Sequence, residues 1–182
     1  MQALLGKPQG EEELVMDWDV LVEQRNEWVA ANFEPGEAFP KTDVQMDTVL
    51  GCVEELGELA HAHLKKSQSI RGTAEEHDAN AKDAIGDLSV YLMGVMRHVG
   101  TPRERKIRAI EGNAMKTLFA LAGAVGTLCD RQSLVDVENI VAFMWGYCEL
   151  LGWDYEEIVC KTWEKVRQRD WKANPHDGGE SA

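Results

Sequence analysis

Three features of the sequence predict an all-α fold. Apolar residues recur every three or four positions over most of the chain, and no stretch of useful length alternates apolar and polar residues as a strand does. All five prolines lie outside the periodic segments, where they interrupt or end helices. Each helix must bury its apolar face against another, and 182 residues suffice for one core, so the sequence predicts a single helical bundle.

The first two predicted helices are separated by the segment FEPGEAFPK, which contains two prolines and a glycine. Helical spacing of apolar residues predicts the first helix from Asp17 to near Asn32 and the second from Val44 to about Lys66. The second carries a broad apolar stripe, so it is expected to pack on the core of the bundle.

A polar connection, SQSIRGTAEEH, leads into the third predicted helix. Thr73 and Glu76 have the spacing of a capping box, in which each side chain bonds the backbone N–H of the other residue. The helix is expected from about Glu75 to His98, because the sequence Gly-Thr-Pro that follows cannot continue it.

Residues 104–151 are predicted to form an inserted pair of helices, one through residues 107–130 and one through residues 135–152. A charged turn separates the two. The last helix is expected to run from Tyr155 to about Trp171, where a Pro- and Gly-containing segment ends it.

One helical domain, residues 14–174, is therefore expected between a flexible leader at 1–13 and a flexible tail at 175–182. The cysteines have no CxxC spacing and lie in or beside apolar stretches, which predicts buried free thiols. They are Cys52, Cys129, Cys148 and Cys160. Neither a secretory signal nor a membrane span is recognisable, so a cytoplasmic protein that does not enter a membrane is expected.

The charge balance is strongly acidic, with 19 Lys and Arg against 32 Asp and Glu and a net charge of -13. Such a surface repels phosphate backbones, so general nucleic-acid binding is not expected. A smaller polyanion can still bind where divalent cations lie between it and the carboxylates, because the metal then dominates the local charge.

Four carboxylates occupy neighbouring faces of the second and third predicted helices. Glu55 and Glu58 are three residues apart, and Asp83 and Asp87 are four apart, so each pair shares a helix face. Apolar residues flank both pairs, and the short connection makes the two helices antiparallel neighbours. Carboxylates gathered in this way repel one another unless a cation compensates. An all-oxygen ligand set favours Mg²⁺, with Mn²⁺ as a possible substitute.

Two other interpretations of these residues remain open. The carboxylates can be solvated side chains of ordinary acidic helices. Glu58 and His61 also form the ExxH pair that is typical of carboxylate-bridged di-iron bundles, although such sites require a second ExxH on another helix and the sequence offers none. His61 and His63 are more simply explained as a pair at the surface or beside the metal ligands.

At these positions the sequence resembles the MazG-like, all-α nucleoside triphosphate pyrophosphohydrolases, whose signature is EExxE followed by ExxD. Residues 54–58 match the first half in full, and Asp87 matches the second. Ala84 stands where the second half has glutamate, while Asp83 lies one place earlier. The segments EWVAANF, SIRG and TWEKVRQRDWKANP extend the resemblance towards both ends, whereas residues 104–151 fall outside it as two additional helices.

The resemblance implies cleavage of a (d)NTP between its α- and β-phosphates, giving (d)NMP and pyrophosphate. It implies that Glu55, Glu58, Asp83 and Asp87 are Mg²⁺ ligands. Glu54 is the candidate for orienting the attacking water or acting as its base, and a solvent-facing helix glutamate is the alternative. A homodimer or a dimer of dimers is expected, because short bundles of this kind often complete their pockets across subunits.

Basic residues are expected to bind the outer phosphates. Lys161, Lys165 and Arg169 recur every four residues and are predicted to form one stripe on the last helix. Lys65 and Arg71, which flank the connection between the acidic helices, are further candidates. Each of these residues taken alone can equally be a solvated surface charge.

Trp28 and Asn32, near the end of the first predicted helix, are candidates for recognising the base. An aromatic ring can stack on a base and an amide can bond its edge, although a tryptophan at such a position is more often part of the core. Trp163 and Trp171 are assigned to packing.

Three functions remain open from the sequence. The first is a Mg²⁺-dependent pyrophosphohydrolase of standard or modified (d)NTPs. The second is an enzyme related to phosphoribosyl-ATP pyrophosphatase, with the same metal requirement and a different substrate. The third is a non-catalytic helical interaction module that uses the pair at residues 104–151 to bind a partner.

Overall fold

The computed structural model describes residues 16–33, 44–103 and 107–174, and within these ranges it contains six helices and no strands. The prediction of an all-α fold is confirmed. The helices are α1 (Trp18–Asn32), α2 (Val44–Gln68), α3 (Ala74–Val99), α4 (Ala114–Arg131), α5 (Leu134–Leu150) and α6 (Tyr155–Val166). The predicted leader, 1–13, and tail, 175–182, lie outside the described residues.

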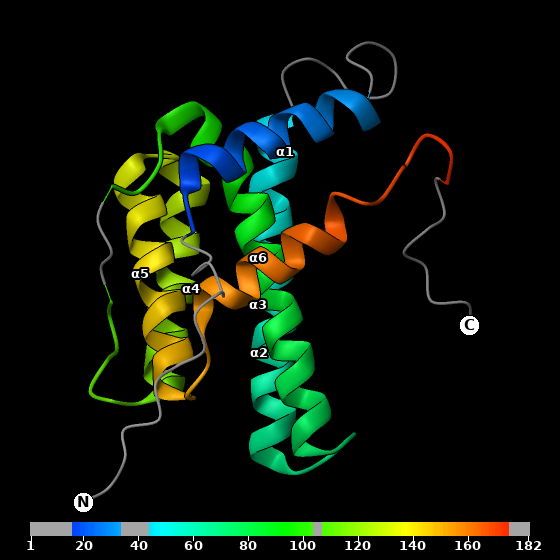
Figure 1. Cartoon of the computed structure of the whole chain (residues 1–182). Helices are drawn as coiled ribbons and strands as arrows, with labels where there is room; N and C mark the ends of the chain where they lie inside the picture. The colour runs from blue at the N-terminus through cyan, green and yellow to red at the C-terminus, as the bar shows by residue number, and fades with distance from the viewer. Residues whose placement is uncertain (1–15, 34–43, 104–106, 175–182) are drawn as a thin grey trace, which may run out of the picture.

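Two helical hairpins form the body of the fold (Figure 1). Helices α2 and α3 make one long antiparallel hairpin, and α4 and α5 make a second beside it, while α1 and α6 cross the first hairpin. Helix α3 is the centre of the arrangement, because it contacts α1, α2, α5 and α6. Its fully buried residues include Ile85, Leu88, Leu92 and Met93, which form the middle of one continuous core. None of the described helices combines the length and apolar character required to cross a bilayer.

The capping box predicted before α3 is confirmed. The backbone N–H of Glu76 donates to Thr73 Oγ1 at 3.1 Å, and the Glu76 carboxylate accepts from the backbone N–H of Thr73 at 2.7 Å. These two bonds satisfy backbone donors that the first turn of a helix leaves without partners. They fix where α3 begins and so set its register against α2.

Two helices are shorter in the structure than the sequence predicts. Residues 107–113 are not helical, because Glu111 and Gly112 have positive φ angles of 51° and 62° and Asn113 caps the start of α4. Helix α6 ends at Val166 instead of near Trp171, so Arg169 lies beyond the helix.

Long-range hydrogen bonds explain the early end of α6. The Trp28 indole N–H donates to the backbone oxygen of Arg169 at 3.0 Å, and the backbone N–H of Trp171 donates to Asn32 Oδ1 at 2.7 Å. If α6 continued, the backbone oxygen of Arg169 and the backbone N–H of Trp171 would pair within the helix. Side chains of α1 bond these groups instead, and residues 167–174 leave the helical path.

The prediction of four buried thiols holds for Cys52 and Cys148 only. Cys160 is half-buried and Cys129 is exposed, and all four are free. Cys129 is exposed because the adjacent Leu128, fully buried, occupies the core-facing position at the end of α4. Apolar character of a stretch does not specify which residue within it faces inward.

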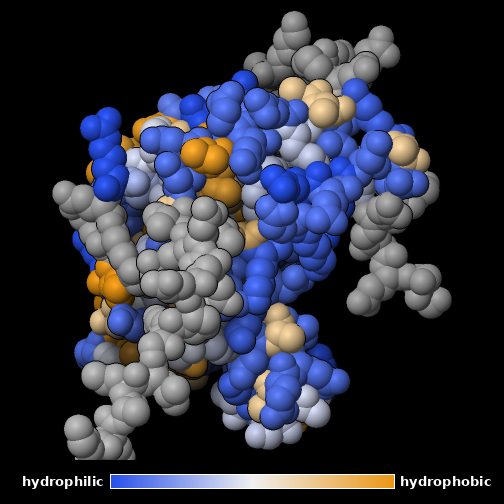
Figure 2. Space-filling view, viewed as in Figure 1, coloured by the Kyte–Doolittle hydropathy of each residue, from blue (hydrophilic) through white to orange (hydrophobic). Residues whose placement is uncertain are grey.

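Part of the apolar stripe of α2 faces outward. Met46, Leu50 and Val53, at spacings of four and three residues, have exposed fractions of 58%, 67% and 41%. On α4, Phe119 is 69% exposed. From the side shown in Figure 2 the surface over α6 and the end of the α2–α3 hairpin is largely hydrophilic, and hydrophobic patches gather over the α4–α5 side.

Candidate metal centre

A glycine in α3 sets the position of α6. A Cβ atom added to Gly86 would lie 2.0 Å from Thr162 Oγ1, far closer than non-bonded atoms approach, so the absence of a side chain allows α6 to pack directly on α3. Gly86 immediately precedes Asp87 and follows Asp83 by three residues. The point where α6 crosses α3 therefore lies beside the acidic face of α3. The crossing brings the basic residues that follow Thr162 towards the carboxylates of Asp83 and Asp87.

The carboxylates of α2 and α3 share one negative environment. Glu55 is buried, with 8% of its surface exposed, Asp87 is half-buried, and Glu58 and Asp83 are exposed at the rim. Burial raises the pKa of Glu55 to about 8, helped by the negative charges of Asp87 and Glu58. Carboxylates of both helices therefore lie near enough to Glu55 to disfavour its charged form.

Asp87 lies between acidic and basic neighbours. Burial raises the pKa of its carboxyl to about 6, and Asp83 adds to the rise, while the positive charges of Arg169 and Lys165 oppose it. Lys165 Nζ is 3.3 Å from Asp83 Oδ1. The acidic cluster, defined as Glu55, Glu58, Asp83 and Asp87, is therefore bordered by two cations from the α6 side.

The predicted basic stripe is divided in the structure. Lys165 and Arg169 lie near the acidic cluster, but Arg169 reaches it from the turn after α6, with its guanidinium 5.6 Å from the centre of the Trp171 ring. Lys161 is paired with Glu157 one turn earlier. The predicted stripe on a single helix is therefore wrong for Arg169, although the charges still lie on one side of the site.

Lys65 and Arg71 lie at the far end of the α2–α3 hairpin. Lys65 is seven residues beyond Glu58, about 10 Å along the helix axis, and its ammonium donates to Gln68 at 3.4 Å. Arg71 is exposed in the connection, with a φ of 61°. Neither residue borders the acidic cluster as Lys165 does.

Glu54 lies in a hollow that also reaches the acidic cluster at Glu58. Together with Glu58 and His61 it lines a hollow of about 420 Å³ between α2 and α3, which Asn80 borders from the other helix. Glu54 is exposed, so its carboxylate is accessible to water next to Glu58. The sequence did not single out Asn80 as a site residue. Its position three residues before Asp83, which puts both on the same face of α3, was the available signal.

Trp28 and Asn32 use their polar atoms within the protein. Beyond the bonds to Arg169 and Trp171, the Asn32 amide donates to the backbone oxygen of Trp28 at 3.0 Å. The Trp28 ring packs edge-on against Trp163, with ring centres 6.2 Å apart. These contacts join α1 to the segment after α6, close to Arg169, and their predicted role towards a base remains a prediction.

The two histidines of α2 have different surroundings. His63 Nδ1 is 2.8 Å from the hydroxyl oxygen of Tyr147 on α5, and burial lowers its pKa. His61 is exposed in the hollow that Glu54 lines. His63 therefore packs against the second hairpin instead of approaching the carboxylates.

Oxygen donors form the acidic cluster, and its excess negative charge fits a hard divalent cation such as Mg²⁺. Among the residues that the structure describes, no three acidic, histidine or cysteine side chains are grouped closely enough to hold a metal ion. The acidic cluster is therefore not a formed ligand set in this structure, and binding of an ion there would require its side chains to move closer together. Comparison of the chain with family models, with curated proteins and with solved structures finds no match.

Proposed function

We propose that the chain is a Mg²⁺-dependent nucleoside triphosphate pyrophosphohydrolase that cleaves a (d)NTP into (d)NMP and pyrophosphate. The observation that carries the proposal is the buried Glu55 of α2, whose pKa the negative charges of Asp87 and Glu58 help to raise, together with the cations Arg169 and Lys165 near Asp87. A buried carboxylate among like charges is unfavourable for folding alone, and such groups concentrate at functional sites. The resemblance to MazG-like enzymes assigns the same residues to the metal.

The acidic cluster, Glu55, Glu58, Asp83 and Asp87, would hold the ion. When bound, Mg²⁺ would neutralise phosphate charge and lower the pKa of a water molecule. Lys165 and Arg169 bind the outer phosphates through charge-assisted hydrogen bonds, which strengthen as negative charge moves to the leaving pyrophosphate. Glu54, accessible beside Glu58, orients the attacking water and accepts its proton.

Pyrophosphate release from a panel of nucleotides, with Mg²⁺ and with Mn²⁺, tests this function. The panel contains standard and modified dNTPs, the corresponding NTPs and phosphoribosyl-ATP, and the preferred compound distinguishes the two enzymatic alternatives. We expect Glu58→Gln and Asp87→Asn each to lower kcat by on the order of a hundredfold or more, because each removes a charged ligand.

Glu149→Gln is the matched control for these variants. Glu149 is an exposed glutamate on α5, outside the acidic cluster, and its substitution should leave turnover unchanged. Folding of every variant is checked by circular dichroism. Absence of pyrophosphate release from the whole panel, or full activity in both Glu58→Gln and Asp87→Asn, would contradict the proposal and favour an interaction module.

We also propose that the enzyme is cytoplasmic and forms a homodimer through the outer face of α2. Met46, Leu50 and Val53 form an exposed apolar row on the helix that carries Glu55 and Glu58, and such rows are usually covered by a partner. Sedimentation velocity of the wild type and of Leu50→Glu tests the interface. A wild type that sediments as a monomer at high concentration would contradict it.

A further inference from the structure

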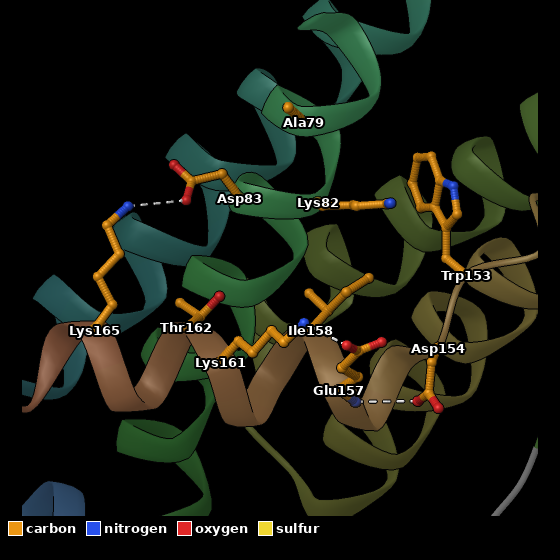
Figure 3. A pocket seen from close by; sticks show the side chains of 10 residues that line it. All are labelled: Ala79, Lys82, Asp83, Trp153, Asp154, Glu157, Ile158, Lys161, Thr162 and Lys165. Atoms are coloured by element: carbon orange, nitrogen blue, oxygen red, sulfur yellow. Dashed lines mark hydrogen bonds and ion pairs between the residues drawn. The ribbon is translucent and has the colours of Figure 1, made fainter. Parts of the chain in front are cut away.

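A groove of about 430 Å³ lies between α3 and α6 (Figure 3). Ile158 and Thr162 of α6 lie along its length. Lys82 and Trp153 border one end, and Asp83 and Lys165 border the other. Its volume lies within the range of small-molecule sites, and the residues of its second end also belong to the proposed catalytic site.

Trp153 is a fixed aromatic wall of this groove. Its backbone N–H donates to the oxygen of Cys148 at 2.9 Å, and its ring packs edge-on against Tyr147 with ring centres 6.2 Å apart. The ammonium of Lys82 lies 5.0 Å from the centre of the indole ring, on the groove side in Figure 3. A flexible cation thus lies over one face of a positioned indole, and an incoming planar ring can displace it.

The polar groups that line the groove balance one another. The lining contains three lysines and three acidic residues, so their formal charges cancel; they are Lys82, Lys161, Lys165, Asp83, Asp154 and Glu157. Lys161 pairs with Glu157, and the backbone N–H of Glu157 donates to Asp154 Oδ1 at 3.0 Å. A lining without net charge does not favour a polyanion along its whole length. It offers hydrogen-bond donors and acceptors beside an aromatic face, which is the environment that a neutral nucleobase requires.

We propose that this groove binds the nucleobase of the substrate, with Trp153 as the stacking surface. The inference rests on the proposed function for the position of the phosphates, which Lys165 and the acidic cluster hold at the other end. Ile158 and Lys165 are seven residues apart on α6, about 10 Å along its axis, a span that the sugar and phosphates of a nucleotide bridge. Trp28 and Asn32 lie at the opposite end of α6 with their polar atoms paired, whereas the Trp153 end has open room.

Binding of deoxynucleosides, which lack phosphate, tests the groove independently of catalysis. The probe is a panel of the four deoxynucleosides at millimolar concentration with EDTA, followed in ¹H–¹⁵N spectra. The Trp153 indole signal is identified by its absence in Trp153→Phe. We expect at least one deoxynucleoside to shift this signal in the wild type, and an indole signal unchanged by all four would overturn the inference.

Kinetics of the active enzyme provide the second readout. Trp153→Leu should raise KM for the preferred dNTP about tenfold, because it removes the ring on which the base stacks. Trp153→Phe should retain most of the affinity, and Mn²⁺ binding should be unchanged in both variants. Phe143→Leu is the matched control, because Phe143 is also a partly buried ring with a cation, Arg108, 5.9 Å from its centre, and it lies on α5 outside the groove.

The outcomes separate this inference from the proposed function. Pyrophosphate release with a KM within twofold of the wild type in Trp153→Leu would overturn the base site and leave the hydrolase. Deoxynucleoside binding at Trp153 without pyrophosphate release from any compound would support the base site and overturn the hydrolase. If Trp153→Leu does not fold, the indole signal of the wild type decides alone.

Discussion

Glu55 on α2 and Asp136 on α5 are both buried carboxylates, and their surroundings are opposite. Burial alone raises the pKa of either group, but Asp136 accepts hydrogen bonds from the Ser133 hydroxyl at 2.6 Å and from Arg131 at 2.6 Å, and these bonds lower its pKa overall. Glu55 instead faces other carboxylates, and its pKa rises to about 8. One carboxylate is fully compensated within the fold, and the other lacks such compensation.

The two helical hairpins differ in the same way as these two carboxylates. In the α4–α5 hairpin Asp136 completes a capping box with Ser133 and links the turn to the last residue of α4, so its role is structural. In the α2–α3 hairpin the like charges oppose folding, and a bound cation would relieve them. This difference locates the proposed chemistry in the first hairpin and leaves the second as support for α3 and for the Trp153 wall of the groove.

Removing Asp136 should produce the largest change in stability. We expect Asp136→Ala to lower the free energy of unfolding by about 3 kcal/mol, because it leaves the half-buried donors of Ser133 without their acceptor and ends the pairing with Arg131. Urea denaturation measures the loss. Glu55→Ala should cost much less at neutral pH, and an equal loss in the two variants would remove the distinction between the carboxylates.

The glycines of the two hairpins provide the next test. Gly86→Ala should destabilise the protein by about 2 kcal/mol and lower activity, because the new Cβ would collide with Thr162 and displace α6. Gly123→Ala in α4 meets no atom within 4 Å and should stabilise by about 0.5–1 kcal/mol. Thermal unfolding of both variants measures the difference. Equal effects would indicate that α6 does not depend on the close approach at Gly86.

The smallest of the three compared differences is the pH dependence caused by Glu55. Its pKa is raised in the folded state, so its contribution to stability is fully present below its ordinary pKa and is lost as the pH rises through about 8. In EDTA, the stability of Glu55→Gln relative to the wild type should therefore increase by about 1–2 kcal/mol between pH 5 and pH 8.5. Urea titrations at the two pH values measure this change, and an unchanged difference would contradict the shared negative environment.

Much of the fold could be predicted from local sequence signals. The starts of α1, α2 and α3 followed from apolar spacing and from the capping box of Thr73 and Glu76, which depend on neighbours within one or two helical turns. The end of α6 could not be predicted. It depends on Trp28 and Asn32, which are 141 and 139 residues from the groups they bond.

The candidate site was predictable in part for the same reason. Helical spacing placed Glu55 with Glu58, and Asp83 with Asp87, on shared faces, and in the structure the charges of Asp87 and Glu58 both raise the pKa of Glu55. That the four residues bind one metal ion stays a prediction. The sequence did not indicate Trp153, because this residue lies in the connection before α6, where no helical periodicity shows which way a ring points. The available signal was its position directly before Asp154, the residue that caps the start of α6.

Titration of Mn²⁺ into the metal-free protein by isothermal calorimetry, followed by the same titration of Glu55→Gln and Asp87→Asn, tests the central claim most directly. If the carboxylates of α2 and α3 act as one ligand set, the wild type binds the ion and each substitution weakens binding at least tenfold, while Asp136→Asn does not. No heat of binding in the wild type, or equal affinity in all four proteins, would contradict the account.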